Sequence, residues 1–205
     1  MLPEPATLSI ERRLTPDQAE RRGRVVAAAR ALAAEGGYAA VSMGAVAGRA
    51  RLSRATLYRY FASKDHLLAE VIAGWGDEIT AGLRARPPKG AASVRVARVF
   101  TRVLDSAQRE PRLAEAVLAS VTSTDPEAIR AQGRFATLIG TYLAAALGDE
   151  SLPDARDLET LMSHVFFSAV VNMTTGRITH AEAVRVVETA IRIFFAAHGE
   201  IGGRP

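Results

Sequence analysis

The amino-acid sequence predicts an all-α protein of about nine helices. Its 205 residues are rich in Ala, Leu and Val, and aromatic residues make up only 6% of the chain. Apolar residues recur every three or four positions, and no run of alternating β-branched residues indicates a strand. Ser, Thr or Asp precedes several of these apolar patterns, where a helix N-cap is expected, and Pro or Gly separates them.

The first predicted helix follows an N-terminal arm. Residues 1–14 have no periodic apolar pattern, so we expect a disordered arm there. Thr15 then stands at an N-cap position, Pro16 at the first helical position, and Gln18 where it completes a capping box. We expect the helix to end at Gly36-Gly37, because glycine is the usual residue just past a helix C-terminus.

Two short helices joined by a tight turn are predicted over residues 42–64. Ser42 and Ser53 each stand at an N-cap position, and Leu52 lies in the turn between the two helices. The predicted buried faces consist of Val46, Ala47, Ala50, Leu57 and Phe61. The outward face of the second helix then carries guanidinium, hydroxyl and phenol groups. Such a face suits the hydrogen-bonding groove of DNA, and the spacing is that of a helix-turn-helix.

The distribution of charge supports a nucleic-acid partner. Residues 1–65 contain 11 Arg or Lys against 6 Asp or Glu, whereas residues 66–205 contain 15 against 16. The whole excess of positive charge therefore lies with the predicted helix-turn-helix, as expected for a DNA-binding domain joined to a neutral one.

The run from Leu52 to Leu68, Leu-Ser-Arg-Ala-Thr-Leu-Tyr-Arg-Tyr-Phe-Ala-Ser-Lys-Asp-His-Leu-Leu, resembles the TetR family of bacterial transcriptional regulators. The likeness covers roughly residues 20–70. Two positions depart from the family pattern. Arg51 stands where the turn usually has Gly, so we expect a non-glycine residue with positive φ there. Gly44 stands where relatives often carry a DNA contact, so we expect less binding from the first of the two helices.

The resemblance implies roles for individual residues of the reader segment. The candidates for contacts with base edges are Arg54, Ala55, Thr56 and Arg59. The candidates for contacts with phosphates are Ser42, Tyr58, Tyr60 and Lys64. Tyr58 and Tyr60 have an alternative role in packing, and residues 1–14 either reach a neighbouring groove or remain solvated. The operator is expected to be a near-palindrome of double-stranded DNA.

The rest of the chain is expected to form a second helical domain. We expect a DNA-binding domain over residues 15–64 and an effector-binding and dimerisation domain over 65–200. The predicted helices of the second domain are 64–82, 92–110, 113–121, 126–147, 155–176 and 180–197. The first of these begins at the DNA-binding domain and ends in the second domain, so it links the two physically.

The last two predicted helices are apolar over a wide arc. One stripe of the last helix consists of Val184, Val187, Ile191 and Phe194, and a second of Val186, Ala190, Ile193 and Ala197. Two stripes exceed what one core contact needs, so we expect a homodimer through these two helices. The alternative is that both helices are central in the monomer.

A largely apolar small-molecule effector is expected in the second domain. The candidate lining residues are Trp75, Phe100, Leu104, Val117, Leu118, Phe135, Leu138, Tyr142, Met162 and Phe166. His164 and Asn172 belong to a polar stripe with Thr160 and Ser168, which faces either the cavity or solvent at a dimer seam. Each apolar residue is alternatively plain core. The segments 36–68 and 109–116 look like the steroid- and lipid-catabolism repressors of the family, which would imply a steroid- or acyl-type ligand.

The sequence gives little support to an enzyme, a metal site or a bound cofactor. There is no cysteine, the four histidines are scattered, and no His-Glu-x-x-His pattern or carboxylate cluster occurs. No apolar run approaches the ~18 residues of a membrane span, and the N-terminus does not have the pattern of a signal peptide, so we expect a cytoplasmic protein. The alternative to a ligand-responsive repressor is a DNA-binding repressor without a small-molecule ligand, controlled by a protein partner.

Overall fold

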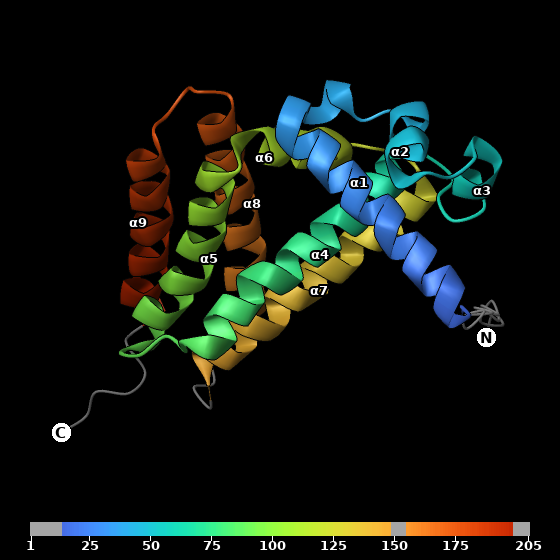
Figure 1. Cartoon of the computed structure of the whole chain (residues 1–205). Coiled ribbons are helices and arrows are strands. Elements are labelled where there is room, and N and C mark those ends of the chain that lie inside the picture. The colour runs from blue at the N-terminus through green and yellow to red at the C-terminus, as the bar shows by residue number, and fades with distance from the viewer. Residues whose placement is uncertain (1–13, 149–154, 199–205) are drawn as a thin grey trace, which may run out of the picture.

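The computed structural model describes residues 14–148 and 155–198, apart from a few side chains in α7 and at the outer ends of α8 and α9. Within these residues the chain is all-α, as predicted, and Figure 1 shows the arrangement. The helices are α1 (Pro16–Ala40), α2 (Met43–Ala50), α3 (Arg54–Tyr58), α4 (Lys64–Ala85), α5 (Ala92–Arg109), α6 (Pro111–Val121), α7 (Pro126–Leu147), α8 (Ala155–Thr174) and α9 (His180–His198). The predicted arm, except Leu14, lies outside the described residues.

Helix α1 begins with the predicted capping box and breaks at the predicted glycines. The Gln18 amide donates to Thr15 Oγ1 at 3.3 Å, and the Thr15 amide donates to Gln18 Oε1 at 3.0 Å. Gly37 has φ 66° and ψ −160°, a conformation that only glycine adopts readily. A Cβ at Gly37 would lie 3.0 Å from the carboxylate of Glu115 in α6. The chain then resumes one further helical turn to Ala40, which the sequence did not predict.

Helices α2 and α3 form the predicted helix-turn-helix. Ser42 Oγ accepts from the Ala45 amide, and Ser53 Oγ accepts from the Thr56 amide, each at 3.1 Å. Arg51 ends α2 in the left-handed conformation, with φ 55° and ψ 47°. It is the one non-glycine residue with positive φ among the described residues, which confirms the expectation from its place in the turn.

Helices α4 and α7 run side by side through the middle of the molecule (Figure 1). Their N-termini meet, because the Asp125 carboxylate that caps α7 also accepts a hydrogen bond from Ser63, the N-cap of α4. The Ser63 hydroxyl, together with the amides of Glu127 and Ala128, lowers the pKa of the Asp125 carboxyl below its usual value. Both helices therefore start from one shared polar junction.

Two clusters of buried apolar side chains stabilise the fold. The first joins α1, α2 and α3 to α4, α6 and the end of α5, and contains Val25, Val46, Leu57, Leu67 and Trp75 among others. The second lies among α5, α7, α8 and α9 and contains Phe100, Leu104, Met162, Val187 and Ile191 among others. The predicted domain boundary at 64/65 passes through the first cluster, and it stays a prediction.

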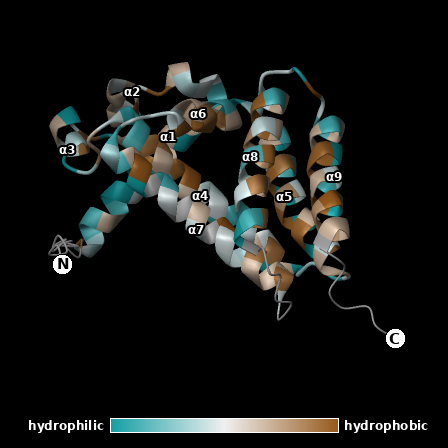
Figure 2. Cartoon of the chain, turned by 180° about the vertical axis from the view of Figure 1, so that it is seen from behind, coloured by the Kyte–Doolittle hydropathy of each residue, from teal (hydrophilic) through white to brown (hydrophobic). Residues whose placement is uncertain are grey.

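Helices α8 and α9 pack against each other at the far side of the molecule from α3 (Figure 2). Thr179 and Glu182 form a capping box at the start of α9, with the Glu182 amide donating to Thr179 Oγ1 at 3.2 Å and the Thr179 amide donating to Glu182 Oε2 at 2.8 Å. The first stripe of α9 faces the core, while Val186 and Ile193 of the second stripe are exposed. No helix among the described residues is both long and apolar enough to cross a bilayer.

The left-handed Arg51 gives a direct stability test. Arg51→Gly should raise the free energy of unfolding by about 0.5 kcal/mol, because relief of about 1 kcal/mol of left-handed strain exceeds the entropy that a glycine loses on folding. Urea denaturation measures the change. Arg51→Ala removes the same charge but keeps a Cβ, so it should not stabilise. Equal stabilisation by both variants would mean that the charge, not the backbone, is responsible.

Candidate nucleic-acid interface and effector cavity

The outward face of α3 presents most of the predicted base-reading side chains together. Arg54, Ala55 and Arg59 are exposed, whereas Leu57 on the opposite face is fully buried. Thr56 is half-buried, and its hydroxyl shares a hydrogen bond of 2.9 Å with Ser53 Oγ. The two arginines are thus exposed at the start of this short, capped helix and at its C-cap. Accessible donors on such a helix are what base readout in a major groove requires.

Gly44 of α2 lies directly beneath the Arg54 side chain. A Cβ at Gly44 would come within 2.5 Å of an Arg54 guanidinium nitrogen and 3.1 Å of its central carbon. The absence of a side chain at Gly44 therefore leaves room for the guanidinium against α2. The sequence predicts a smaller contribution of α2 to binding because of Gly44, and the structure adds that a side chain at this position would displace the guanidinium of a predicted reader of α3.

The predicted phosphate contacts differ in how accessible they are. Ser42 and Tyr58 are exposed, and 53% of Tyr58 is accessible to solvent. Tyr60 is half-buried and packs against the first core cluster, which favours its alternative role in packing. The ring of Tyr58 is exposed, which favours its predicted contact with a DNA phosphate.

Lys64 is already engaged within the protein. Its ammonium donates to the backbone carbonyl of Tyr38 and lies 3.3 Å from the centre of the Tyr38 ring. The Tyr38 hydroxyl in turn donates to Asp65 Oδ1 at 2.8 Å, and this bond raises the pKa of the Tyr38 phenol. Burial lowers the pKa of the Lys64 ammonium. Only the remaining donors of Lys64 are available for a phosphate, so its predicted role stays a proposal.

A second group of arginines lies beside the reader helix. Arg24 of α1, Arg49 of α2 and Arg51 of the turn line one shallow groove between α1 and α2. Arg49 is paired with Glu35 at 2.5 Å, while Arg51 is exposed. The sequence marks Arg51 only as an unusual backbone position. Arg24 and Arg51 are far apart in the sequence, and no motif indicates that folding brings their side chains into one groove.

Among the described residues, a small apolar cavity of about 210 Å³ lies where α5, α7 and α8 meet. Of the predicted effector residues, Phe100 and Met162 line it. Leu104, Tyr142 and Phe166 belong to the surrounding core, and the rings of Phe100 and Phe166 are 5.3 Å apart. The lining residues that sequence reasoning missed are Val96, Gly140, Leu143, Ala144, Leu147, Arg156, Leu158 and Glu159.

The other predicted effector residues lie elsewhere. Trp75 and Val117 belong to or pack against the first core cluster, and Leu118 is half-buried on α6. His164 is exposed on α8, and Asn172 donates to the Ser168 carbonyl of its own helix at 2.8 Å. The polar stripe of α8 therefore faces away from the cavity, toward solvent, which was the alternative interpretation. The side chains of Phe135 and Leu138 lie outside the described part of the structure.

Comparison with known proteins finds matches both to the helix-turn-helix and to the helices that follow it. The family model for bacterial regulatory proteins of the tetR family matches residues 25–71, and that for a tetracyclin repressor-like C-terminal domain matches residues 90–194. The transcriptional repressor KstR of Rhodococcus jostii is 32% identical over 92% of this chain and 89% of its own. The chain belongs to the TetR family of bacterial transcriptional regulators.

Further relatives extend this likeness. KstR of Mycobacterium tuberculosis is 32% identical over 86% of this chain and 81% of its own length. A TetR transcriptional regulator from Rhodococcus sp. RHA1 has a solved structure that covers 89% of this chain and 100% of its own, with a TM-score of 0.79 and 26% identity. FadR of Bacillus subtilis, solved in complex with stearoyl-CoA, shares the fold at a TM-score of 0.65 and 15% identity, over 89% of this chain and 99% of its own. TetR-family regulators act by binding DNA and are not enzymes.

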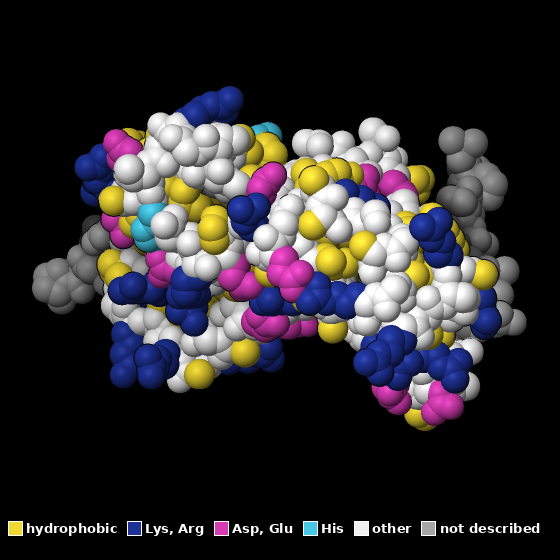
Figure 3. Space-filling view, turned by 45° about the horizontal axis from the view of Figure 1, so that its top comes forward, with side chains coloured by type: hydrophobic (Ala, Val, Ile, Leu, Met, Phe, Trp, Pro, Cys, Tyr) yellow, Lys and Arg dark blue, Asp and Glu magenta, His cyan; other side chains and the backbone are white. Residues whose placement is uncertain are grey.

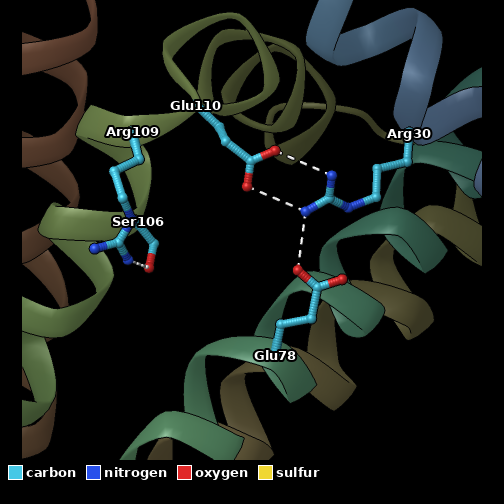
Figure 4. Close-up of polar contacts among 5 residues, drawn as sticks. All are labelled: Arg30, Glu78, Ser106, Arg109 and Glu110. Atoms are coloured by element: carbon cyan, nitrogen blue, oxygen red, sulfur yellow. Dashed lines mark hydrogen bonds and ion pairs between the residues drawn. The ribbon is translucent and has the colours of Figure 1, made fainter.

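In this TetR-family chain an arginine of α1 connects the helix-turn-helix to the second half of the molecule (Figure 4). Arg30 donates to both carboxylate oxygens of Glu110, at 3.0 and 3.1 Å, and to Glu78 of α4 at 2.9 Å. Arg22 of α1 is paired with Glu70 of α4 at 2.5 Å. Acidic and basic side chains lie side by side across the middle of the surface drawn in Figure 3. The two-oxygen contact with Glu110 fixes α1 against the start of α6.

The close approach of Gly44 and Arg54 predicts a separable effect on DNA binding. Gly44→Ala and Gly48→Ala should each raise helix stability by up to about 1 kcal/mol, but a Cβ at Gly48 meets no atom within 4 Å. Only Gly44→Ala should displace Arg54 and weaken binding to a selected operator, by about 1 kcal/mol. Fluorescence anisotropy with the operator duplex measures the affinity.

A double-mutant cycle supplies the control for this prediction. In an Arg54→Ala background, Gly44→Ala should leave operator affinity unchanged, because the displaced side chain is gone. A similar loss from Gly44→Ala with and without Arg54 would show that the glycine acts through the backbone of α2.

Proposed function

We propose that this repressor binds a near-palindromic operator as a homodimer and is released by a largely apolar small molecule. The observation that carries the proposal is the continuity of α4. This helix starts beside the reader helix, packs along α7 and ends against the second core cluster through Leu83. At about 1.5 Å per residue it spans about 33 Å, so a tilt at one end changes the position of the other.

The operator contacts follow from the exposed face of α3. We assign base edges to Arg54, Ala55, Thr56 and Arg59, and phosphates to Ser42, Tyr58, Tyr60 and Lys64. A dimer with a two-fold axis would place its two reader helices about 34 Å apart, one turn of DNA. Loss of that spacing lowers affinity for the operator, and by linkage the operator lowers affinity for the effector by the same factor.

The homodimer is supported by the outer surfaces of α8 and α9. Leu161 and Phe167 of α8, and Val186 and Ile193 of α9, are large apolar side chains between 44% and 58% exposed. These side chains lie on two neighbouring helices, and in the monomer they remain exposed to solvent. Two such helices from each of two chains would bury these side chains in a four-helix interface.

A charge placed on this surface should dissociate the dimer. Ile193→Asp should shift the sedimentation coefficient toward that of a monomer at micromolar concentration, because a carboxylate would be buried without a partner. Ala181→Asp introduces the same charge at an exposed position on the polar side of α9, away from Val186 and Ile193, and should leave the dimer intact. A wild-type chain that sediments as a monomer would contradict the proposed interface.

The effector is proposed to enter the apolar cavity between α5, α7 and α8. At about 210 Å³ the cavity is smaller than most ligand sites, so α7 or α8 has to move outward when a ligand enters. Arg156 and Glu159 at its edge offer charged groups to orient the ligand. A steroid- or acyl-type ligand is supported by the likeness of residues 36–68 and 109–116 to catabolic repressors, and FadR of the same fold holds stearoyl-CoA.

Control by a protein partner remains a second candidate function. The small volume of the cavity favours it, because a solid core leaves the regulatory signal to a surface contact. Denaturing mass spectrometry of small molecules that copurify with the protein, followed by a gel shift with each one, separates the two candidates. A bound molecule that releases the operator supports the effector proposal.

Filling the cavity should abolish the response to such a molecule while preserving DNA binding. Gly140→Leu projects a side chain into the cavity, whereas Gly133→Leu on the same helix meets no atom within 4 Å of its Cβ. In the gel shift, only Gly140→Leu should hold the operator in the presence of effector. Release from both variants would place the effector site elsewhere.

A further inference from the structure

A second, larger hollow has no role in the function proposed above. It is a groove of about 680 Å³ between the end of α4, the following loop and the first turns of α5. Four of its lining residues are cationic, namely Arg86, Lys89, Arg98 and Arg102. No Asp or Glu lines it among the residues that the structure describes. The groove therefore has a concentrated positive charge in an otherwise neutral half of the chain.

Arg102 is half-buried in the groove, while Arg86, Lys89 and Arg98 are exposed. Three other arginines, namely Arg22, Arg30 and Arg49, are each paired with a glutamate. By contrast, none of the four groove cations forms an ion pair or a side-chain hydrogen bond within the described part of the chain. Arg102 Nε is buried and has no hydrogen-bond partner. Leaving a buried donor unsatisfied costs free energy. Because Nε is inaccessible, an anion in the groove would contact the terminal guanidinium nitrogens of Arg102 instead.

The position of Arg102 depends on a glycine in α4. A Cβ at Gly82 would lie 2.6 Å from an Arg102 guanidinium nitrogen and 3.3 Å from its Nε. The guanidinium therefore lies against the backbone of α4, in space that a Cβ at position 82 would enter. A side chain there would displace the end of Arg102, whereas glycine leaves it room.

We propose that this groove binds a small molecule bearing two or more phosphate charges. Arginine guanidinium groups bind phosphate oxygens through paired hydrogen bonds, and lysine adds a point charge. A single carboxylate would neutralise only one of the four cations, whereas a diphosphate matches several. Leu83 and Val94 supply apolar wall for the organic part of the ligand. The diphosphate comes either from a free nucleotide or from the coenzyme A part of a thioester.

DNA is the less suitable partner for this groove. The groove lies at the C-terminal end of α4, and the reader helix α3 lies beside its N-terminal end (Figure 1). The length of α4 separates the two by about 33 Å. DNA bound at α3 therefore does not reach the groove, and a second duplex would have to enter a hollow sized for a small molecule.

Isothermal titration calorimetry on the full-length protein tests the proposal with pyrophosphate, ADP and coenzyme A as probes. We expect binding that weakens as salt rises, and at least a tenfold loss in Arg98→Ala and in Arg102→Ala. Arg84→Ala removes the same charge from α4 at an exposed position outside the groove, so it should change affinity less than threefold. Similar affinities for ADP and coenzyme A indicate a free nucleotide. Because coenzyme A adds a 3′-phosphate and a pantetheine arm to ADP, tenfold tighter coenzyme A indicates that the coenzyme supplies the diphosphate.

Gly82→Ala keeps all four charges and moves only the Arg102 guanidinium, so it provides a variant that cannot act through net charge. A fivefold or greater loss of affinity is expected from it. Thermal unfolding checks that each variant is folded, and Gly82→Ala and Arg98→Ala still decide the question if Arg102→Ala does not fold.

The proposal fails if no probe binds at millimolar concentration and low salt, if Arg84→Ala weakens binding as much as Arg102→Ala, or if only duplex DNA binds. Because the effector cavity is separate, Gly140→Leu leaves this binding unchanged, so failure of one proposal does not imply failure of the other.

Discussion

Burial of one helix in two separate cores is the constraint on which the rest of this structure depends. Helix α4 places Leu67, Leu68, Val71 and Trp75 in the cluster that also holds the helix-turn-helix, and Leu83 in the cluster of α5, α8 and α9. Fully burying a side chain of this size contributes about 1.5–3 kcal/mol, so neither end of α4 separates cheaply from its surroundings. This packing supports the proposed switch, in which movement of the second half of the molecule would shift α4 and with it the reader helix.

Charged contacts add orientation to this apolar attachment. Arg30 reaches from α1 to Glu78 and Glu110, and Figure 4 shows that its two partners come from different helical segments. Such half-exposed pairs contribute little stability individually, because solvent screens them. Their value is geometric, since the contact with both oxygens of Glu110 tolerates only a narrow range of angles between α1 and α6. Gly44 beneath Arg54 and Gly82 beneath Arg102 position guanidinium groups in a comparable way.

The elements of this fold could be predicted because their ends are coded locally. The predicted N-caps form at Thr15, Ser42 and Ser53, since a cap needs only residues within one turn. The exposed face of α3 was predictable for the same reason. Long-range contacts were not. The engagement of Lys64 with Tyr38, and the outward position of His164, depend on how helices pack, which periodicity within one helix does not specify. Of the predicted effector residues, only Phe100 and Met162 line the cavity between α5, α7 and α8, because the position of that cavity depends on how three helices pack.

The break in α1 at Gly37 restricts how this sequence can diverge. Gly37 combines a positive φ with a Glu115 carboxylate 3.0 Å from where a Cβ would lie. A side chain at this position would meet both backbone strain and the α6 carboxylate. The carboxylate could swing aside, but the positive φ would remain, so the backbone is the stronger restriction. A relative with another residue at this position would therefore be expected to leave the left-handed region and to join the two parts of α1 at a different angle.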